Sequence, residues 1–192
     1  MITETVVTQT TPVDTLLQLS GGAVLPRCLH AVANLGIADA LGDAPQSSVT
    51  LAAATGTNSG ALERMLRLLS ANGVFDYRDG LFRHTAASRL LRADHPQSMR
   101  SLVRMFGLSA FWPVIGELEH SLRTGLPTAD KVLPGGVWGY LSGSPEASRI
   151  FDASDLTVRL RGFRCHWRHW WGPGPPPAGC AHERARCPRR PV

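Results

Sequence analysis

The residue types best suited to bind a metal gather near the end of the chain. Three cysteines and three histidines lie within residues 165–187: Cys165, His166, His169, Cys180, His182 and Cys187. Structural zinc sites need such ligands in closely spaced pairs that tight turns, hairpins or helices present. His166 and His169 alone have such a spacing, and the Pro-rich interval that follows offers no scaffold. A built zinc site is therefore the disfavoured interpretation, and we predict no metal ligands.

The whole segment 155–192 lacks the pattern of a folding protein. Beyond its first few residues it has no apolar period of 3.6 or 2, and Pro173 and Pro175 to Pro177 exclude helix and strand pairing. Tryptophan has one codon, so back-translation is informative. Without the first base of the Cys165 codon, the following codons permit V-I-G-D-I-G-G-G, with three glycines dictated by the code. An apolar strand that enters a Gly-rich turn is typical of a phosphate- or nucleoside-binding βα unit.

Two interpretations of this segment remain open. It is a frame-shifted continuation of the gene, or GC-rich DNA permits the glycines by chance. A third, that it is a genuine basic anchor, we consider weaker. Residues 1–154 hold 12 Lys+Arg and 13 Asp+Glu, whereas 155–192 hold 8 and 2, so the net charge of +5 comes from the tail. The basic charge therefore indicates neither a nucleic-acid nor a membrane partner.

The remaining composition favours a cytoplasmic protein. Cys28 is the single cysteine before residue 155, so no disulfide framework is expected. No apolar run approaches the roughly 20 residues that span a bilayer, and the N-terminus lacks the pattern of a signal peptide.

The elements that would position a site lie before residue 155. After a disordered lead-in at 1–12, the pattern predicts a mainly α domain over 13–154 with one small β-hairpin, followed by an irregular tail at 155–192. We expect Asp14 to cap the first helix, Thr50 or Ser48 a later one, and Asn58 or Ser59 the strongest amphipathic helix. The expected helices are 14–20, 24–35, 37–41, 51–56, 60–72, 85–91, 98–107, 111–124, about 138–141 and 145–151. The hairpin is expected at 74–83 around Asp79-Gly80.

The order helix, turn, helix, hairpin is typical of a winged helix. Four segments of the sequence indicate a more specific resemblance: LHAVANLGIADAL (residues 29–41), VTLAAATGTNSGALERMLRLLSANGVF (49–75), GLFRHTAASRLLRADHPQSMRSL (80–102) and VWGYLSGSPEASRIFDAS (137–154). Together they resemble the N-terminal dimerisation and winged-helix domain of actinobacterial S-adenosylmethionine-dependent small-molecule O-methyltransferases. The resemblance covers about residues 13–154.

The resemblance implies a homodimer and, in the full-length parent, a Rossmann-like domain that opens with a D-I-G-G-G-x-G-like cofactor turn. Such enzymes methylate an aromatic acceptor, usually with a histidine as base. The family has a longer helical stretch before that turn, so a deletion as well as a frame change is expected. None of His30, His84, His95 and His120 matches the base, and we assign no catalytic residue. We expect the 192-residue chain to bind no S-adenosylmethionine and to be inactive.

The resemblance also implies where the domain contributes side chains. The acceptor pocket is expected to include Met105, Phe106, Phe111 and Trp112, with plain core packing as the alternative. The dimer interface is expected to include Leu16, Leu19, Leu25, Cys28, Leu29 and Val32, because a nearly uncharged helix needs another surface to cover it, and plain core packing is again the alternative. His30, on that helix, is most simply a core or interface histidine.

The rival interpretation is a winged-helix DNA-binding regulator. Its recognition helix would be 60–72, with Arg64 and Arg67 on phosphates and Arg78 and Arg83 on the wing. The charge of −1 on residues 1–154 argues against it, because counterion release would be weak, and Glu63 on the same helix would repel phosphate.

Overall fold

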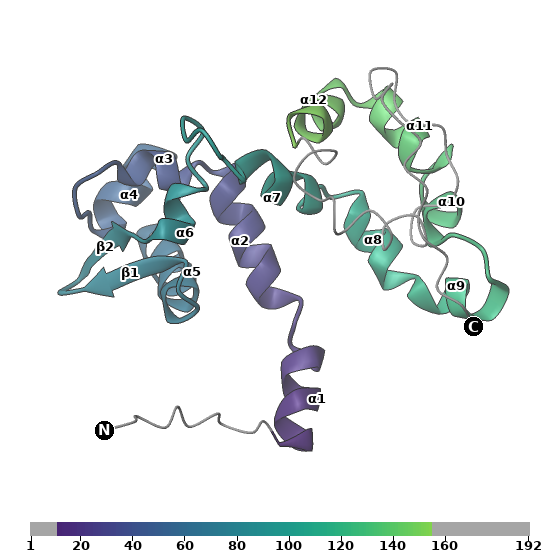
Figure 1. The fold of residues 1–192 in the computed structure, drawn as a ribbon, viewed down its shortest axis with the longest axis horizontal. Helices are drawn as coiled ribbons and strands as arrows, with labels where there is room; N and C mark the ends of the chain where they lie inside the picture. Colours follow the sequence, from purple (N-terminus) through teal and green to yellow (C-terminus); the bar gives the residue numbers. More distant parts are fainter. Residues whose placement is uncertain (1–10, 155–192) are drawn as a thin grey trace, which may run out of the picture. The chain divides into compact units, whose positions relative to one another are not determined.

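The computed structural model describes residues 11–154, and these fall into two compact units whose boundary lies between Ser88 and Arg89 (Figure 1). The predictions for the tail at 155–192 and for residues 1–10 of the lead-in lie outside the described residues. The last two lead-in residues are corrected, because Thr11 caps the first helix and Pro12 begins it. In the described range no helix is both long and apolar enough to cross a bilayer.

The first unit is a set of short helices with one antiparallel hairpin, as predicted. Its elements are α1 (Pro12–Ser20), α2 (Val24–Asn34), α3 (Ile37–Leu41), α4 (Ser48–Thr55), α5 (Ser59–Ala71), β1 (Phe75–Arg78), β2 (Leu81–His84) and, across the boundary, α6 (Ala86–Arg89). The mainly helical fold class with a two-stranded hairpin is therefore confirmed.

Side-chain caps set where these helices begin. Asn58 accepts a hydrogen bond from the backbone N–H of Ala61, as predicted for α5. The cap of α4 was predicted one or more residues too late, because Ser47 accepts from the N–H of Thr50 and the helix starts at Ser48. The cap of α1 was likewise misplaced. Asp14 occupies the third helical position, where it bonds back to Thr11.

The hairpin turns at Asp79-Gly80, and both residues have positive φ, 53° and 77°. Two consecutive left-handed residues form the tight turn whose twist matches that of paired strands. The register places Tyr77 opposite Phe82, with ring centroids 4.6 Å apart. Gln46 then pairs with the outer edge of β2, exchanging both backbone hydrogen bonds with Phe82 at 2.8 and 3.1 Å.

One hydrophobic cluster joins these elements. Leu66 and Leu69 of α5 are fully buried against the hairpin and the neighbouring helices. Leu68 of the same helix is 38% exposed. The buried members are Val32, Ile37, Leu41, Leu51, Ala52, Leu62, Leu66, Leu69, Phe75 and Phe82.

The second unit is all helical over its described residues. It contains α7 (Arg100–Phe106), α8 (Phe111–Gly116), α9 (Leu118–Thr124), α10 (Thr128–Val132), α11 (Gly136–Gly143) and α12 (Pro145–Ala153). The predicted helix 111–124 is in fact two helices, since Glu117 leaves the helical conformation at φ −98° and ψ 20°. Its neighbour Gly116 is a weak helix former. Helix α10 was not predicted.

This unit has its own hydrophobic cluster, to which α7, α8, α10, α11 and α12 contribute. Ring contacts tie its parts together: Phe111 meets Tyr140 edge-on at 6.3 Å, and Trp138 meets Phe151 at 5.9 Å. The buried members are Leu102, Met105, Phe111, Val114, Ala129, Leu133, Val137, Leu141, Ala147 and Ile150.

Candidate dimerisation surface

Helix α1 is amphipathic, yet it contains no buried residue. Leu16 is 67% exposed and Leu19 is 74% exposed; their place in a dimer interface stays a prediction. Val13 at 64% and Leu17 at 67%, which were not among the residues predicted for the interface, are exposed on the same helix. Within the described range, four large apolar side chains on one short helix therefore lie open to solvent.

Helix α2 continues the surface but is anchored to its own unit. Leu25, Cys28 and Leu29 are half-buried and pack against the first cluster, so each presents only part of its side chain to the outside. Val32 is 0% exposed and belongs to that cluster. The structure thus places Val32 in the core of its own protomer, which separates it from the other five residues predicted for the interface. Val24, 60% exposed at the start of α2, takes its place on the open side.

His30 lies on the same helix and is buried, with 7% of its surface exposed. Burial lowers the pKa of its imidazole, and the nearby charge of Arg27 lowers it further. The neutral form of the ring is therefore favoured, which suits a position among apolar neighbours.

The four residues predicted for the acceptor pocket lie on α7 and at the start of α8. Met105 and Phe111 are buried in the second cluster, and the Met105 sulfur accepts a hydrogen bond from the Ser154 hydroxyl at 3.8 Å. Phe106 packs against the same cluster, and Trp112 is half-buried. Met105 and Phe111 thus serve as core, the alternative stated for them, while the pocket assignment stays a prediction.

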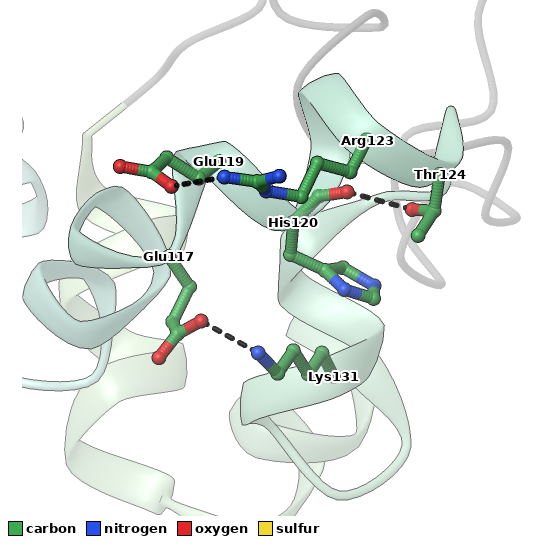
Figure 2. Close-up of polar contacts among 6 residues, drawn as sticks. All are labelled: Glu117, Glu119, His120, Arg123, Thr124 and Lys131. Atoms are coloured by element: carbon green, nitrogen blue, oxygen red, sulfur yellow. Dashed lines mark hydrogen bonds and ion pairs between the residues drawn. The ribbon is translucent and has the colours of Figure 1, made fainter.

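The remaining described histidines have local roles. The His84 Nδ1 atom is 2.9 Å from the Ser88 hydroxyl, and His95 Nδ1 accepts a hydrogen bond from the Gln97 backbone N–H at 3.0 Å. His120 lies on α9 among charged side chains of the surface (Figure 2). No catalytic role was assigned to any of them, and the geometry gives no reason to add one.

Figure 2 also shows how surface charges pair around the break between α8 and α9. Lys131 of α10 donates to Glu117 at 2.6 Å, and Arg123 donates to Glu119 at 3.1 Å. The hydrogen bond from Lys131 lowers the pKa of Glu117, and the lysine charge adds to the effect. The first pair connects the break at Glu117 to α10, the second lies within α9, and neither forms a site.

Two charged side chains of α5, the recognition helix of the rival regulator interpretation, contact other elements of the same unit. The Arg67 guanidinium lies over the Tyr77 ring at 5.5 Å. Glu63 accepts hydrogen bonds from Ser48 at 3.3 Å and from the Tyr77 hydroxyl at 3.4 Å. These contacts connect α5 to α4 and to the hairpin.

Comparison with known proteins gives one consistent result. A family model described as the O-methyltransferase dimerisation domain matches residues 17–94. Phenazine O-methyltransferase PhzM of Lysobacter antibioticus is 36% identical over 140 residues, which cover 71% of this chain and 40% of that protein. The mitomycin biosynthesis 6-O-methyltransferase of Streptomyces lavendulae is 31% identical over 149 residues, 77% of this chain and 43% of the relative.

Solved structures agree. The crystal structure of LaPhzM superposes with a TM-score of 0.70 at 34% identity and covers 76% of this chain and 44% of that one. CalO1, a methyltransferase in calicheamicin biosynthesis in its SAH-bound form, gives a TM-score of 0.68 at 32% identity, with 75% and 43% covered. This chain therefore spans about two fifths of the length of these relatives. Residues 17–94 are a dimerisation domain of the O-methyltransferases of secondary metabolism.

Proposed function

We propose that this chain forms a homodimer through α1 and the open side of α2, and that it serves in this way within an S-adenosylmethionine-dependent methyltransferase. The observation that carries the proposal is the exposure of Leu16, Leu17 and Leu19 on a helix with no buried residue. A second copy of the same surface is the occupant that fits, because the matched domain is named for dimerisation.

The free energy gained by burying these apolar side chains is consistent with a second copy of the chain as the partner. Fully burying a Leu or Val side chain gains about 1.5–3 kcal/mol. A two-fold dimer would cover four such side chains of α1 from each copy, each about two-thirds exposed, for a gain on the order of 10 kcal/mol. Association costs about 4–15 kcal/mol, so α1 supplies a driving force of the right size but needs the added area of Val24, Leu25 and Leu29.

Two charge insertions test the surface. Leu16→Arg and Leu19→Arg should each shift the protein from dimer to monomer in analytical ultracentrifugation at tens of micromolar, because an interface that buries an unpaired guanidinium is strongly penalised. Leu122→Arg is the matched control. Leu122 is 85% exposed on α9, outside the proposed surface, and its variant should remain dimeric.

Circular dichroism of each variant checks that the fold persists, which exposed positions should allow. A monomeric wild-type chain, or equal behaviour of the three variants, would refute the homodimer.

We propose further that the full-length parent transfers a methyl group from S-adenosylmethionine to an aromatic small molecule. Three similar proteins, CalO1, PigF and NcsB1, were solved with SAH bound. Others are named for O-methylation of phenazine or 3-amino-4-hydroxybenzoate and for N-methylation of phenazine-1-carboxylate. Transfer requires the methyl carbon in line with the acceptor atom, and this domain would contribute apolar side chains that position the ring, with Phe106 and Trp112 the more exposed candidates.

Acceptor atoms of both kinds occur among relatives of similar identity, 36% for the phenazine O-methyltransferase and 34% for the N-methyltransferase of Pseudomonas aeruginosa. The proposal therefore specifies an aromatic acceptor and does not specify the acceptor atom. A DNA-binding role has no comparable support, since Arg67 and Glu63 are engaged within the unit.

A further inference from the structure

Strand β1 is an open edge of the hairpin sheet. Gln46 exchanges both backbone hydrogen bonds with Phe82 on the far side of β2, so the Phe82 N–H and C=O point away from β1. Tyr77 lies directly opposite Phe82, and the two residues of such an antiparallel pair direct their backbone groups away from each other. The N–H and C=O of Tyr77, and of Phe75 two residues earlier, therefore point outward from the sheet. No hydrogen bond to these groups is found within residues 11–154.

A hollow of about 290 Å³ lies beside this edge, between β1 and the second half of α5. The Tyr77 side chain is on the α5 side of the strand, because its hydroxyl donates to Glu63 and its ring meets Arg67. A strand added to β1 would place every second side chain on this same side, in the hollow. The lining consists of Arg67, Ser70, Ala71, Phe75, Asp76 and Tyr77.

The charge that the hollow offers is positive. Its acidic residue, Asp76, is paired with Arg78 at 3.1 Å. The exposed Arg67 lies over the Tyr77 ring at 5.5 Å and has no carboxylate within ion-pair distance among the described residues. A cation–π contact uses no hydrogen-bond donor, so the guanidinium N–H groups remain able to donate to a carboxylate.

We propose that the β1 edge binds an extended acidic segment of a partner protein. The segment pairs antiparallel with β1 through the backbone N–H and C=O of Phe75 and Tyr77, and it places a carboxylate beside Arg67. Addition of a strand to an exposed sheet edge takes its affinity from main-chain hydrogen bonds and its specificity from alternate side chains. The site shares no residue with the dimerisation surface, and the proposal depends neither on dimerisation nor on methyl transfer.

The test uses the 192-residue chain and, as probe, the acetylated and amidated peptide Val-Thr-Glu-Thr-Val. Its β-branched residues favour the extended conformation, and its central Glu is the residue that would lie opposite Tyr77. Nitrogen-15 NMR should show saturable shifts of the Phe75 and Tyr77 amide signals, with a Kd on the order of 1 mM. Hydrogen exchange of these two amides should slow as the peptide binds.

Two modified peptides test the main-chain pairing on the unchanged protein. N-methylation of the central Glu removes the N–H that would face β1 and should weaken binding at least about tenfold. N-methylation of the Thr that follows it is the matched control. That N–H would point away from β1, so the affinity should be unchanged.

Two protein variants test the charge. Arg67→Gln should weaken binding of the Glu peptide about two- to fivefold, the range of an exposed ion pair. The same variant should bind a peptide with Gln in place of Glu as well as the wild type does. Arg64→Gln is the matched control, because Arg64 is an exposed arginine of α5 outside the lining, and it should leave both affinities unchanged.

Several results would overturn the proposal. The edge is no docking site if the Phe75 and Tyr77 amide signals stay unshifted up to about 10 mM peptide, or if the two N-methylated peptides bind equally. An equal effect of Arg67→Gln on the Glu and Gln peptides would reject the acidic partner. Shifts of the same two signals that grow with protein concentration alone would assign the edge to a second copy of the chain.

Discussion

At the residue scale, the buried imidazole of His30 links folding to pH. Burial lowers its pKa in the folded chain, so the unfolded chain binds the proton more readily. The free energy of unfolding is then fully retained above the unfolded-state pKa of about 6.5 and falls as the pH drops toward the lowered folded-state value.

We predict that His30→Gln flattens this dependence. Urea unfolding at about pH 7.5 and about pH 5.5 should show a loss of stability on acidification that is larger in the wild type than in the variant. His120→Gln, which changes a histidine of the charged surface in Figure 2, should behave like the wild type. An identical acid-induced loss in the wild type and His30→Gln would assign the effect to other groups.

A second residue, Asp79, adopts a conformation that few side chains tolerate. Its φ of 53° is the single positive value at a non-glycine among the described residues. Left-handed backbone costs about 1–2 kcal/mol for ordinary residues and less for Asp or Asn. Asp79→Val should therefore destabilise the first unit by about 1 kcal/mol, whereas Asp79→Asn should be neutral or stabilising. Thermal unfolding measures both, and equal losses would show that the carboxylate, not the backbone, matters.

At the scale of elements, the capping box of α1 holds the proposed dimer helix together. Asp14 N–H donates to the Thr11 hydroxyl oxygen at 3.1 Å, and Thr11 N–H donates back to Asp14 at 3.1 Å. The helix has no buried residue, so its caps contribute a larger share of its stability than in a packed helix. Hydrogen bonds from Thr11 also lower the pKa of Asp14.

We predict that Thr11→Ala destabilises α1 by about 1 kcal/mol and thereby weakens the dimer. Hydrogen exchange of the α1 amides should speed up, while the amides of α5 stay as in the wild type. Thr11→Ser, which keeps the hydroxyl, is the control and should restore protection. Unchanged exchange in Thr11→Ala would mean that a partner surface, and not the cap, fixes the helix.

The elements that sequence predicted best are those with two independent local signals. Helix α5 combines a strong apolar period with an Asn58 cap and a Gly73 stop, and the hairpin combines alternating strands with the Asp79-Gly80 turn. Helix α10 has neither, since five residues are too few to show a period of 3.6. The break at Glu117 was missed because the apolar pattern continues across it. A periodic pattern of apolar residues does not show where the helix axis changes direction.

Candidate site residues were predicted less well than helices and strands, because the exposure of a side chain depends on packing between distant segments. Leu16 and Val32 look equally apolar in sequence, but one is 67% exposed and the other 0%. Which side of an apolar helix its own unit covers depends on packing between distant segments, here α2 against α3 and α5.

At the scale of the whole molecule, the described residues include the proposed dimerisation surface, and no residue among them has been assigned to methyl transfer. Each unit has a hydrophobic cluster of its own. The relatives extend over more than twice the length matched here, so methyl transfer stays part of the proposed function of a longer protein.

The frame-shift interpretation makes the last prediction. The 192-residue chain should show no saturable S-adenosylmethionine binding in calorimetry, because the glycines of residues 165–192 do not follow an apolar strand: Gly172 and Gly174 lie among prolines, and Gly179 stands alone. Removing one base before the Cys165 codon, repairing the upstream gap where necessary, and extending into the following DNA should create a strand, a Gly-rich turn and a helix. That protein should bind the cofactor and methylate a hydroxylated aromatic compound, with Trp112→Ala raising the acceptor KM more than it lowers kcat. A stop codon within a few residues of the shifted frame would instead reject the frame shift and leave the tail as a sequence in its own right.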